Sequence, residues 1–443
     1  MTDYLAGRQT AGLGTDHAEL NAKLDALARC FDLDWLKADG ANPLQILWKS
    51  SRDAFATNEL LNFGDAVKNF ERVDPGWLER KVSTIKTGDD GNRAGAIFEL
   101  LGLNMFLSAG NKVVPSSSSN PGYDGVVELP DQSVLLVSIK NHGMTSYEKV
   151  FHKHAKELDD QFTGWLRRHA ASGTELRILC RSRLDATEWG KLKKDVMGIL
   201  NGQLDGTAKK LQMRSCNIVL KDIDAEYRPL STTQISSVVF ICARAHKNQQ
   251  DKFIEDLRKG CTNLVNHTKN QPASACPVLF VRLCANASVS NCEKWARDYF
   301  EQFPKERVGL ILLYQAAIVT SGNSNSITHH LLPIQGPQFD AWAHPPGKPA
   351  RRLPNMAVLI GVISREASRK VIQIDGRQIP LDDAYAYQRG DIYRFCRWEG
   401  SELEAHLSNP APRIKIHAEI GNDSGSVVLQ GFLTQTGELL LLP

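Results

Sequence analysis

Hydrophobic positions change their spacing along the chain, and the changes predict three kinds of region. Near the start, apolar residues recur three or four positions apart: Leu20, Leu24, Leu27 and Phe31. This is the spacing of one helix face, with Thr15 or Asp16 available as a cap. We therefore predict a helical N-terminal region over residues 1–87.

From Ala94 the elements follow a regular order. A helix that carries Ile97, Phe98 and Leu101 ends near Gly110, and the strands NKVVP, GYDGVVEL and SVLLVSIKN follow. A long helix, the strand ELRILCRS, a further helix and the strand NIVLKDI come next. Residues 88–227 are thus predicted to form one domain with the order helix, three strands, helix, strand.

The remaining chain divides at a proline-rich segment, PPGKPARRLP. Before it, strands alternate with helices, which predicts a second α/β domain over residues 228–344. After it, alternating strands predict a β-rich domain over 355–443, with a hairpin turn at Asp375-Gly376. The expected fold class is α/β, a mixed α+β chain. No glycine-rich nucleotide fingerprint appears at a strand-to-helix turn.

Composition narrows the class of protein. The net charge of +3 over 443 residues is small, so any basic footprint must be local. The nine cysteines lack CxxC pairs, and the N-terminus lacks the features of a signal peptide, so we expect a cytoplasmic protein with reduced thiols. The longest apolar run is too short to span a bilayer, and no membrane partner is expected.

Three charged residues stand in an order that suits metal-dependent phosphodiester hydrolysis. Glu99 lies on a predicted helix, Asp124 follows a loop, and Lys140 ends an apolar strand. Carboxylates and a backbone carbonyl can hold Mg²⁺ or Mn²⁺, and a nearby lysine can orient water or stabilise developing charge. Each residue also has a purely structural interpretation, as a solvated helix glutamate, a turn former or an edge lysine.

The stretch RAGAIFELLGLNMFLSAGNKVVPSSSSNPGYDGVVELPDQSVLLVSIKN resembles the PD-(D/E)XK, or restriction-endonuclease-like, superfamily. The resemblance covers residues 88–220 and implies a restriction-endonuclease-like core. It implies catalytic roles for Glu99, Asp124, Ser138, Lys140 and Gln161, with metal held by Glu99, Asp124 and the Ile139 carbonyl. Gln161 and Trp165 resemble the Gln-x-x-x-Tyr element of the RecB-like branch.

Ser138 departs from the pattern, because an acid is expected there. A hydroxyl is a poorer Mg²⁺ ligand than a carboxylate. Ser138 leaves one negative charge fewer to balance a cation, and three outcomes are open. Glu99 supplies that charge, another acid such as Glu128 enters the site, or the domain no longer holds metal. The resemblance implies a nuclease of the kind used in prokaryotic defence, acting alone, as a homodimer or with a protein partner, and we expect DNA as its substrate in preference to RNA. A non-catalytic nucleic-acid-binding or scaffold subunit is the alternative, and a protein-interaction adaptor is a third.

Basic residues form a local footprint after the proposed site. Between Lys149 and Arg214, lysines and arginines outnumber acids by fourteen to eight. The footprint predicts either phosphate contacts or a solvated charged face. The arginines and tyrosines between Lys348 and Arg397 suit a protein interface or base stacking.

Overall fold

The computed structural model describes most of the chain. The described residues are 2–8, 16–51, 53–116, 122–169, 174–202, 209–212, 216–222, 237–284, 287–321, 324–367, 369–374, 377–389, 396–398, 416–419 and 426–429. They form a mixed fold of helices and strands, as the sequence predicted for the fold class. Two main sheets, of seven and five strands, organise it.

Six helices make up the N-terminal layer: α1 (His17–Phe31), α2 (Leu33–Lys37), α3 (Pro43–Lys49), α4 (Ala54–Val73), α5 (Pro75–Thr87) and α6 (Asp90–Ser108). Aspartate or asparagine caps each of them, as Asp89 does for α6 through the backbone N–H of Asn92. The helices expected in this region are therefore present, and their apolar faces join one core with the neighbouring sheet.

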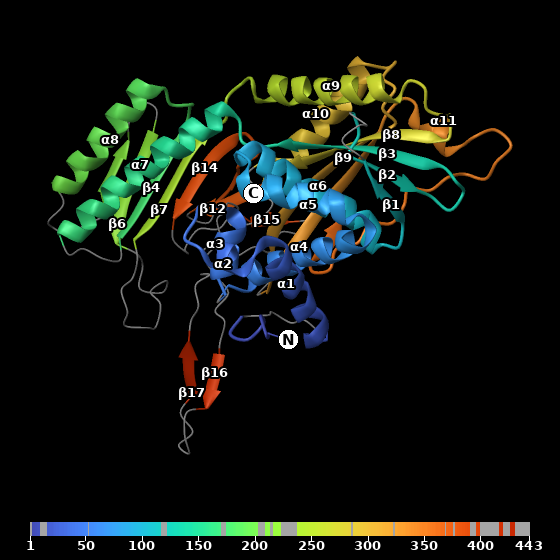
Figure 1. Cartoon of the computed structure of the whole chain (residues 1–443). Helices are drawn as coiled ribbons and strands as arrows, with labels where there is room; N and C mark the ends of the chain where they lie inside the picture. Colours follow the sequence, from blue (N-terminus) through green and yellow to red (C-terminus); the bar gives the residue numbers. More distant parts are fainter. Residues whose placement is uncertain are drawn as a thin grey trace.

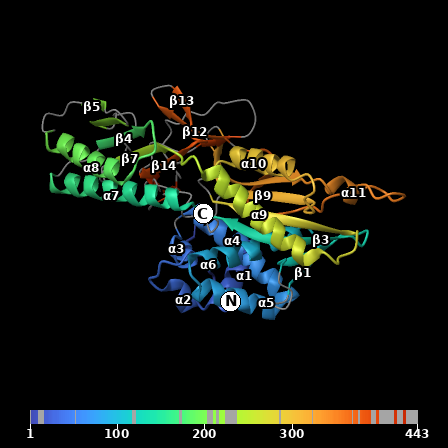
Figure 2. The same cartoon turned by 90° about the horizontal axis from the view of Figure 1, so that it is seen from above.

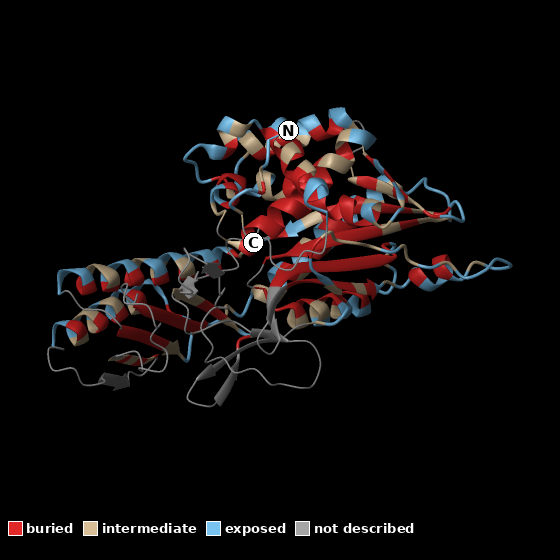
Figure 3. Cartoon of the chain, turned by 90° about the horizontal axis from the view of Figure 1, so that it is seen from below, coloured by how far each residue is buried: buried red, intermediate tan, exposed pale blue. Residues whose placement is uncertain are grey.

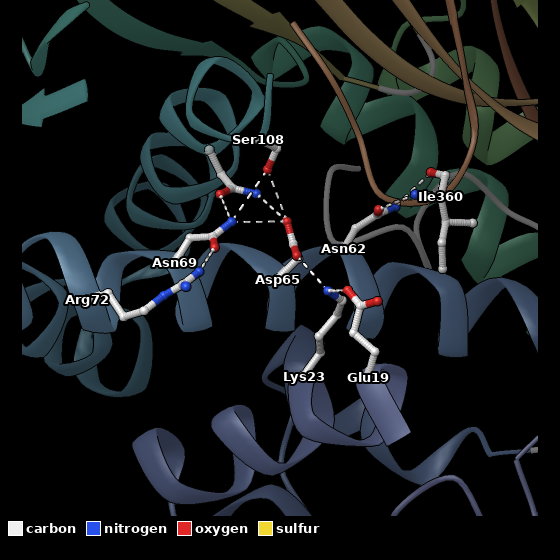
Figure 4. A network of polar contacts seen from close by, with 9 residues as sticks. Glu19, Lys23, Asn62, Asp65, Asn69, Arg72, Ser108 and Ile360 are labelled. Atoms are coloured by element: carbon white, nitrogen blue, oxygen red, sulfur yellow. Dashed lines mark hydrogen bonds and ion pairs between the residues drawn. The ribbon is translucent and has the colours of Figure 1, made fainter. Parts of the chain in front are cut away.

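A polar network within this layer fixes the position of α6 (Figure 4). Asp65 of α4 accepts hydrogen bonds from Lys23 of α1 at 2.9 Å and from Asn104 and Ser108 of α6 at 3.0 and 3.1 Å. A buried carboxylate is stable only when its oxygens are paired in this way. Asp65 therefore ties three helices together, and α6 carries Glu99.

The seven-stranded sheet has the order β1 (Lys112–Pro115), β2 (Gly125–Glu128), β3 (Val134–His142), β8 (Ala275–Leu283), β9 (Leu310–Ser321), β10 (Ser324–Gln335) and β11 (Val362–Ser364). β1, β2 and β3 form an antiparallel meander, and β3 then pairs in parallel with β8. Helices α9 (Gln249–Thr268) and α10 (Val289–Gln302) cover one face, opposite the N-terminal helices (Figures 1 and 2). The short α11 (Phe339–Ala343) packs on β8.

The five-stranded sheet has the order β14 (Ala384–Arg389), β7 (Val238–Arg244), β4 (Thr174–Cys180), β6 (Cys216–Asp222) and β5 (Lys209–Gln212). Helices α7 (Ser146–Arg168) and α8 (Ala186–Asn201) supply its helical layer. This unit lies beside the seven-stranded sheet at the left of Figure 1. Its strands come from two parts of the chain, because β14 follows the seven-stranded sheet in sequence.

The domain boundaries expected at 227 and 228 do not coincide with these sheets. β3 and β4 were expected in one domain, but β4 pairs with β6 and β7, and the parallel neighbour of β3 is β8. The reason lies in the faces of the strands. In β8, Phe280 belongs to the core beneath α6 and Leu279 to the core beneath α9, so this strand suits a sheet covered on both faces. The central strands are accordingly buried (Figure 3).

The expected β-rich domain at 355–443 is also divided among sheets. β11 joins the seven-stranded sheet and β14 the five-stranded one. A three-stranded sheet contains β13 (Arg377–Pro380), β12 (Arg369–Ile374) and β15 (Cys396–Trp398), and a separate pair contains β16 (Ile416–Glu419) and β17 (Ser426–Leu429). The antiparallel pairing of Ile374 with Arg377 agrees with a hairpin, although Asp375-Gly376 lies outside the described residues.

Candidate active site

Asp124 is held against β3 by two hydrogen bonds. Its backbone N–H donates to the Val137 carbonyl at 2.7 Å, and its Oδ2 accepts from the Ile139 N–H at 2.6 Å. A carboxylate that accepts a backbone N–H in this way is fixed in position. The turn before β2 therefore aims Asp124 at the carboxyl-terminal half of β3.

Glu99 approaches the same place from α6. The helix lies very close to the sheet at Gly102, where an added Cβ would meet Phe280 at 3.1 Å and Ile139 at 3.3 Å. Because Glu99 is three residues before Gly102, it lies on the same side of the helix. Glycine at this position thus allows α6 to bring Glu99 to the sheet.

Burial and a neighbouring charge act together on the Glu99 carboxyl group. Burial raises its pKa, and the negative charge of Asp124 raises it further. An ion pair with Lys81 of α5 and the charge of Lys140 act in the opposite direction, but the pKa remains above its usual range. Glu99, Asp124 and Lys140 therefore lie close enough to act on one another electrostatically, as the sequence order suggested.

Lys140 and Ile139 complete this group. The Lys140 Nζ donates to the Ile139 carbonyl at 3.1 Å, and its side chain is half-buried. The Ile139 peptide thus contacts Asp124 through its N–H and Lys140 through its C=O. A carbonyl oxygen is thereby available between the two charged groups.

Ser138 lies one residue earlier and is fully buried. It pairs across the sheet with Leu279, which packs in the core beneath α9. Within the described ranges, its Oγ has no hydrogen-bond partner. An unpartnered buried hydroxyl is costly and can accept a small polar ligand or water. Ser138 is therefore adjacent to Ile139 in the chain, but its side chain makes no hydrogen bond to Asp124 or Lys140.

Glu128 does not enter the site as a replacement acid. It pairs with Lys112 at 2.9 Å, and it lies opposite Val134, six residues before Lys140 on β3. At a rise of about 3.3 Å per strand residue, this corresponds to about 20 Å. Glu128 therefore holds the far end of the β1–β2 pair.

Gln161 also lies away from the site, contrary to the resemblance. It is exposed on α7, fifteen residues beyond Ser146, and about 1.5 Å of rise per residue places it about 22 Å along the helix axis. Trp165 is buried instead and donates to Asn201 of α8 at 3.0 Å. The apolar face of α7 packs in the five-stranded unit, whereas α9 packs on β3.

Residues outside the predicted site set also contact this group and the end of β3, and of these the sequence analysis missed Lys81 and Asp256. Lys81 is the ion-pair partner of Glu99, and His142 contacts Asp256 of α9 at 3.2 Å. Burial raises the pKa of Asp256, but hydrogen bonds from His142 and Lys252 outweigh it and lower the pKa overall. Only the Lys252–Asp256 pair had a signal in the sequence, since residues four apart on a helix are neighbours.

The donor set suits a hard divalent cation in part. Within the described residues, no group of three or more His, Cys, Asp or Glu side chains is placed to hold a metal ion. Two carboxylates and the Ile139 carbonyl are nevertheless oxygen donors of the type that Mg²⁺ uses together with water. Lys81 and Lys140 already balance the two negative charges, so a cation would have to compete with Lys81 for Glu99.

Comparisons with known proteins give no independent identification. No family model, no curated protein and no solved structure matches this chain. In the described part of the chain, no helix combines the length and apolar character that crossing a bilayer requires. Any functional conclusion therefore depends on the site itself.

Proposed function

We propose that this protein is a metal-dependent nuclease that hydrolyses phosphodiester bonds. The observation that carries the proposal is that Asp124 and Lys140 both contact the Ile139 peptide, and that Glu99 lies near enough to interact with both charges. Burial and the neighbouring Asp124 carboxylate together raise the pKa of Glu99, so an added positive charge beside the two acids would be favourable. Such a pair beside a lysine suits phosphate chemistry better than it suits a stabilising role.

The order of elements supports the same proposal. Helix α6, strands β1, β2 and β3, helix α9 and strand β8 follow the helix, three strands, helix, strand order expected for a restriction-endonuclease-like core. On this reading, residues 143–248 are an insertion between β3 and α9. The proposed core thus differs from the continuous domain that the sequence suggested, and it excludes Gln161.

Each residue of the group has a distinct role in the proposal. Glu99, Asp124 and the Ile139 carbonyl would hold Mg²⁺ or Mn²⁺, which when bound polarises a phosphoryl oxygen and lowers the pKa of a bound water. Lys140 would place its ammonium beside the scissile phosphate and stabilise developing negative charge. The Ile139 N–H keeps Asp124 oriented throughout. We propose DNA as the substrate, and a cytoplasmic role in prokaryotic defence, on the resemblance alone.

A non-catalytic nucleic-acid-binding subunit is the second candidate. Lys81 occupies one oxygen of Glu99, and Ser138 stands in place of a ligand acid. The Lys81 ammonium thus supplies the positive charge that a cation would supply, and Ser138 adds no negative charge. A core that has lost its metal needs both features, because its remaining acids must still be neutralised.

Cleavage assays separate the two candidates. Plasmid DNA and RNA are incubated with wild type and with Asp124→Ala, Lys140→Ala and Lys112→Ala, with Mg²⁺ or Mn²⁺ present. Wild type and Lys112→Ala should cleave equally, because Lys112 lies at the far end of the sheet. The two site variants should lose about 100-fold or more. Wild type that binds nucleic acid but cleaves neither substrate supports the second candidate.

A further inference from the structure

A cleft opens where the two sheet units meet. It encloses about 770 Å³, within the range of about 300–1,000 Å³ typical of ligand sites. Its walls come from the ends of β4 and β7 in the five-stranded unit and from the first turns of α9 and α10 beside the seven-stranded sheet. Segments far apart in the chain therefore converge on one cavity.

The cleft is lined by five cationic side chains: Arg181, Arg183, Arg244, Lys247 and Lys294. In the part of the chain that the structure describes, no carboxylate lies within 4.0 Å of the first four. The fifth reaches Asp298 only at 4.0 Å and is mostly exposed. Mutually repelling cations without acids are unfavourable unless an anion or solvent balances them.

The two acids in the cleft wall are engaged elsewhere. Asp382 accepts from the Ser288 hydroxyl at 2.9 Å, and Asp383 accepts from the Asn291 amide at 3.1 Å. These bonds join the segment before β14 to α10. The acids therefore connect the units, and the cleft lining still carries five cations against these two carboxylates.

Planar side chains lie in the cleft and beside it. Tyr147 stacks on His246 with ring centroids 3.5 Å apart and planes 3° apart, and the Arg183 guanidinium lies 5.5 Å from the Tyr147 ring. Trp295 lines the cleft from α10. Flat aromatic and guanidinium surfaces of this kind can stack unpaired bases, whereas bases inside a duplex are inaccessible to them.

The cleft lies next to the candidate active site. Phe253, in the second turn of α9, contacts His142 of β3 at 5.0 Å between ring centroids and Trp295 at 5.8 Å. His142 is two residues beyond Lys140. The buried Phe253 therefore lies between Trp295 of the cleft and His142 at the end of β3.

We propose that this cleft binds the phosphates of single-stranded nucleic acid. Five cations against two acids, stacking surfaces and a cavity of this size suit a flexible single strand better than a rigid duplex. The inference rests on the proposed function in one respect: it takes the strand bound in the cleft to be the substrate strand that reaches Lys140. The footprint expected from the sequence contributes Arg181 and Arg183, whereas Lys193 of that footprint is paired with Glu157.

The test measures binding without cleavage. A fluorescein-labelled DNA strand of about 15 nucleotides, and its duplex, are titrated in EDTA by anisotropy over about 50–200 mM salt. The variant Arg244→Gln/Lys247→Gln removes two exposed cations of the cleft. Its matched control, Arg258→Gln/Lys305→Gln, removes one exposed arginine and one exposed lysine outside it.

The proposal expects wild type and the control to bind the single strand with the same steep salt dependence, and more tightly than the duplex. The cleft variant should bind more weakly, with its log–log salt slope reduced by about 1.4, twice the ~0.7 of one single-strand phosphate contact. Equal losses in both variants, or preference for the duplex, would overturn the proposal. If wild type does not bind the labelled single strand but still cleaves plasmid, the cleft proposal is wrong and the nuclease proposal stands. Binding without cleavage by wild type rejects only the nuclease proposal.

Discussion

Lys81 is the side chain that any cation at the site must displace, so its removal tests the site directly. The Lys81–Glu99 pair is about four-fifths buried on both sides, with side-chain exposures of 21% and 19%. A hydrogen bond to a charged group at such a position contributes about 1.5–3 kcal/mol. If cation binding gives up this bond, Lys81→Gln should tighten Mn²⁺ binding by roughly 10- to 100-fold, at about 1.4 kcal/mol per factor of ten.

Titration calorimetry with Mn²⁺ measures this change. Arg80→Gln is the matched control, because it removes one cation from the adjacent position of α5, where the side chain is exposed. The control should bind Mn²⁺ as wild type does, and Asp124→Asn should abolish binding in the Lys81→Gln background. A Lys81→Gln protein that binds Mn²⁺ no more tightly than wild type would refute a ligand role for Glu99.

Three further predictions concern packing and charge. Gly102→Val should cost about 1–3 kcal/mol in chemical denaturation, because its side chain overlaps Phe280, whereas Gly95→Ala on the same helix, where nothing lies within 4 Å, should be neutral or stabilising. Folding raises the Glu99 pKa, so the folded protein binds more protons than the unfolded one above the ordinary carboxyl pKa and loses stability as the pH rises through that window. Glu99→Gln should remove this loss of stability. The unfolding free energy of the variant minus that of wild type should therefore increase from about pH 4 to pH 7. If this difference does not change with pH, Glu99 does not have a raised pKa in the folded protein. Asp159→Asn should lower the free energy of unfolding by about 3 kcal/mol, because it removes the buried negative charge that Arg389 contacts at 2.7 and 2.8 Å. Amide hydrogen exchange in β14 should then increase. Unchanged exchange would show that another contact holds β14.

Local signals in the sequence predicted elements well, and with them part of the site. The spacing of apolar residues and the caps identified the N-terminal helices and the meander of three strands. Glu99, Asp124 and Lys140 lie within this contiguous stretch, so their proximity follows from local connections. Lys81 precedes the stretch, and no spacing rule connects it to Glu99.

The partner of β3 could not be predicted from local pattern. The amphipathic helix α7 follows β3 directly, and its apolar face suits either sheet. What decides the outcome is the match between strands: β8 is largely apolar on both faces, whereas β4 alternates Leu176 and Ile178 with the charged, buried Glu175 and Arg177. Pairing between residues more than a hundred positions apart leaves no periodic signal, and Gln161 was misplaced for this reason.

The late arrival of β14 has a consequence for how the protein is made. Among the described strands, β14 alone pairs with one edge of β7, and synthesis must proceed from residue 244 to residue 389 before β14 exists. At about 5–20 residues per second, the apolar edge of VVFICAR remains open for roughly 7–30 s on each nascent chain. An open edge of this kind is a template for pairing with another chain. Slow translation or truncation before residue 389 should therefore favour aggregation, and the yield of folded protein would depend on chaperones that shield β7 during synthesis.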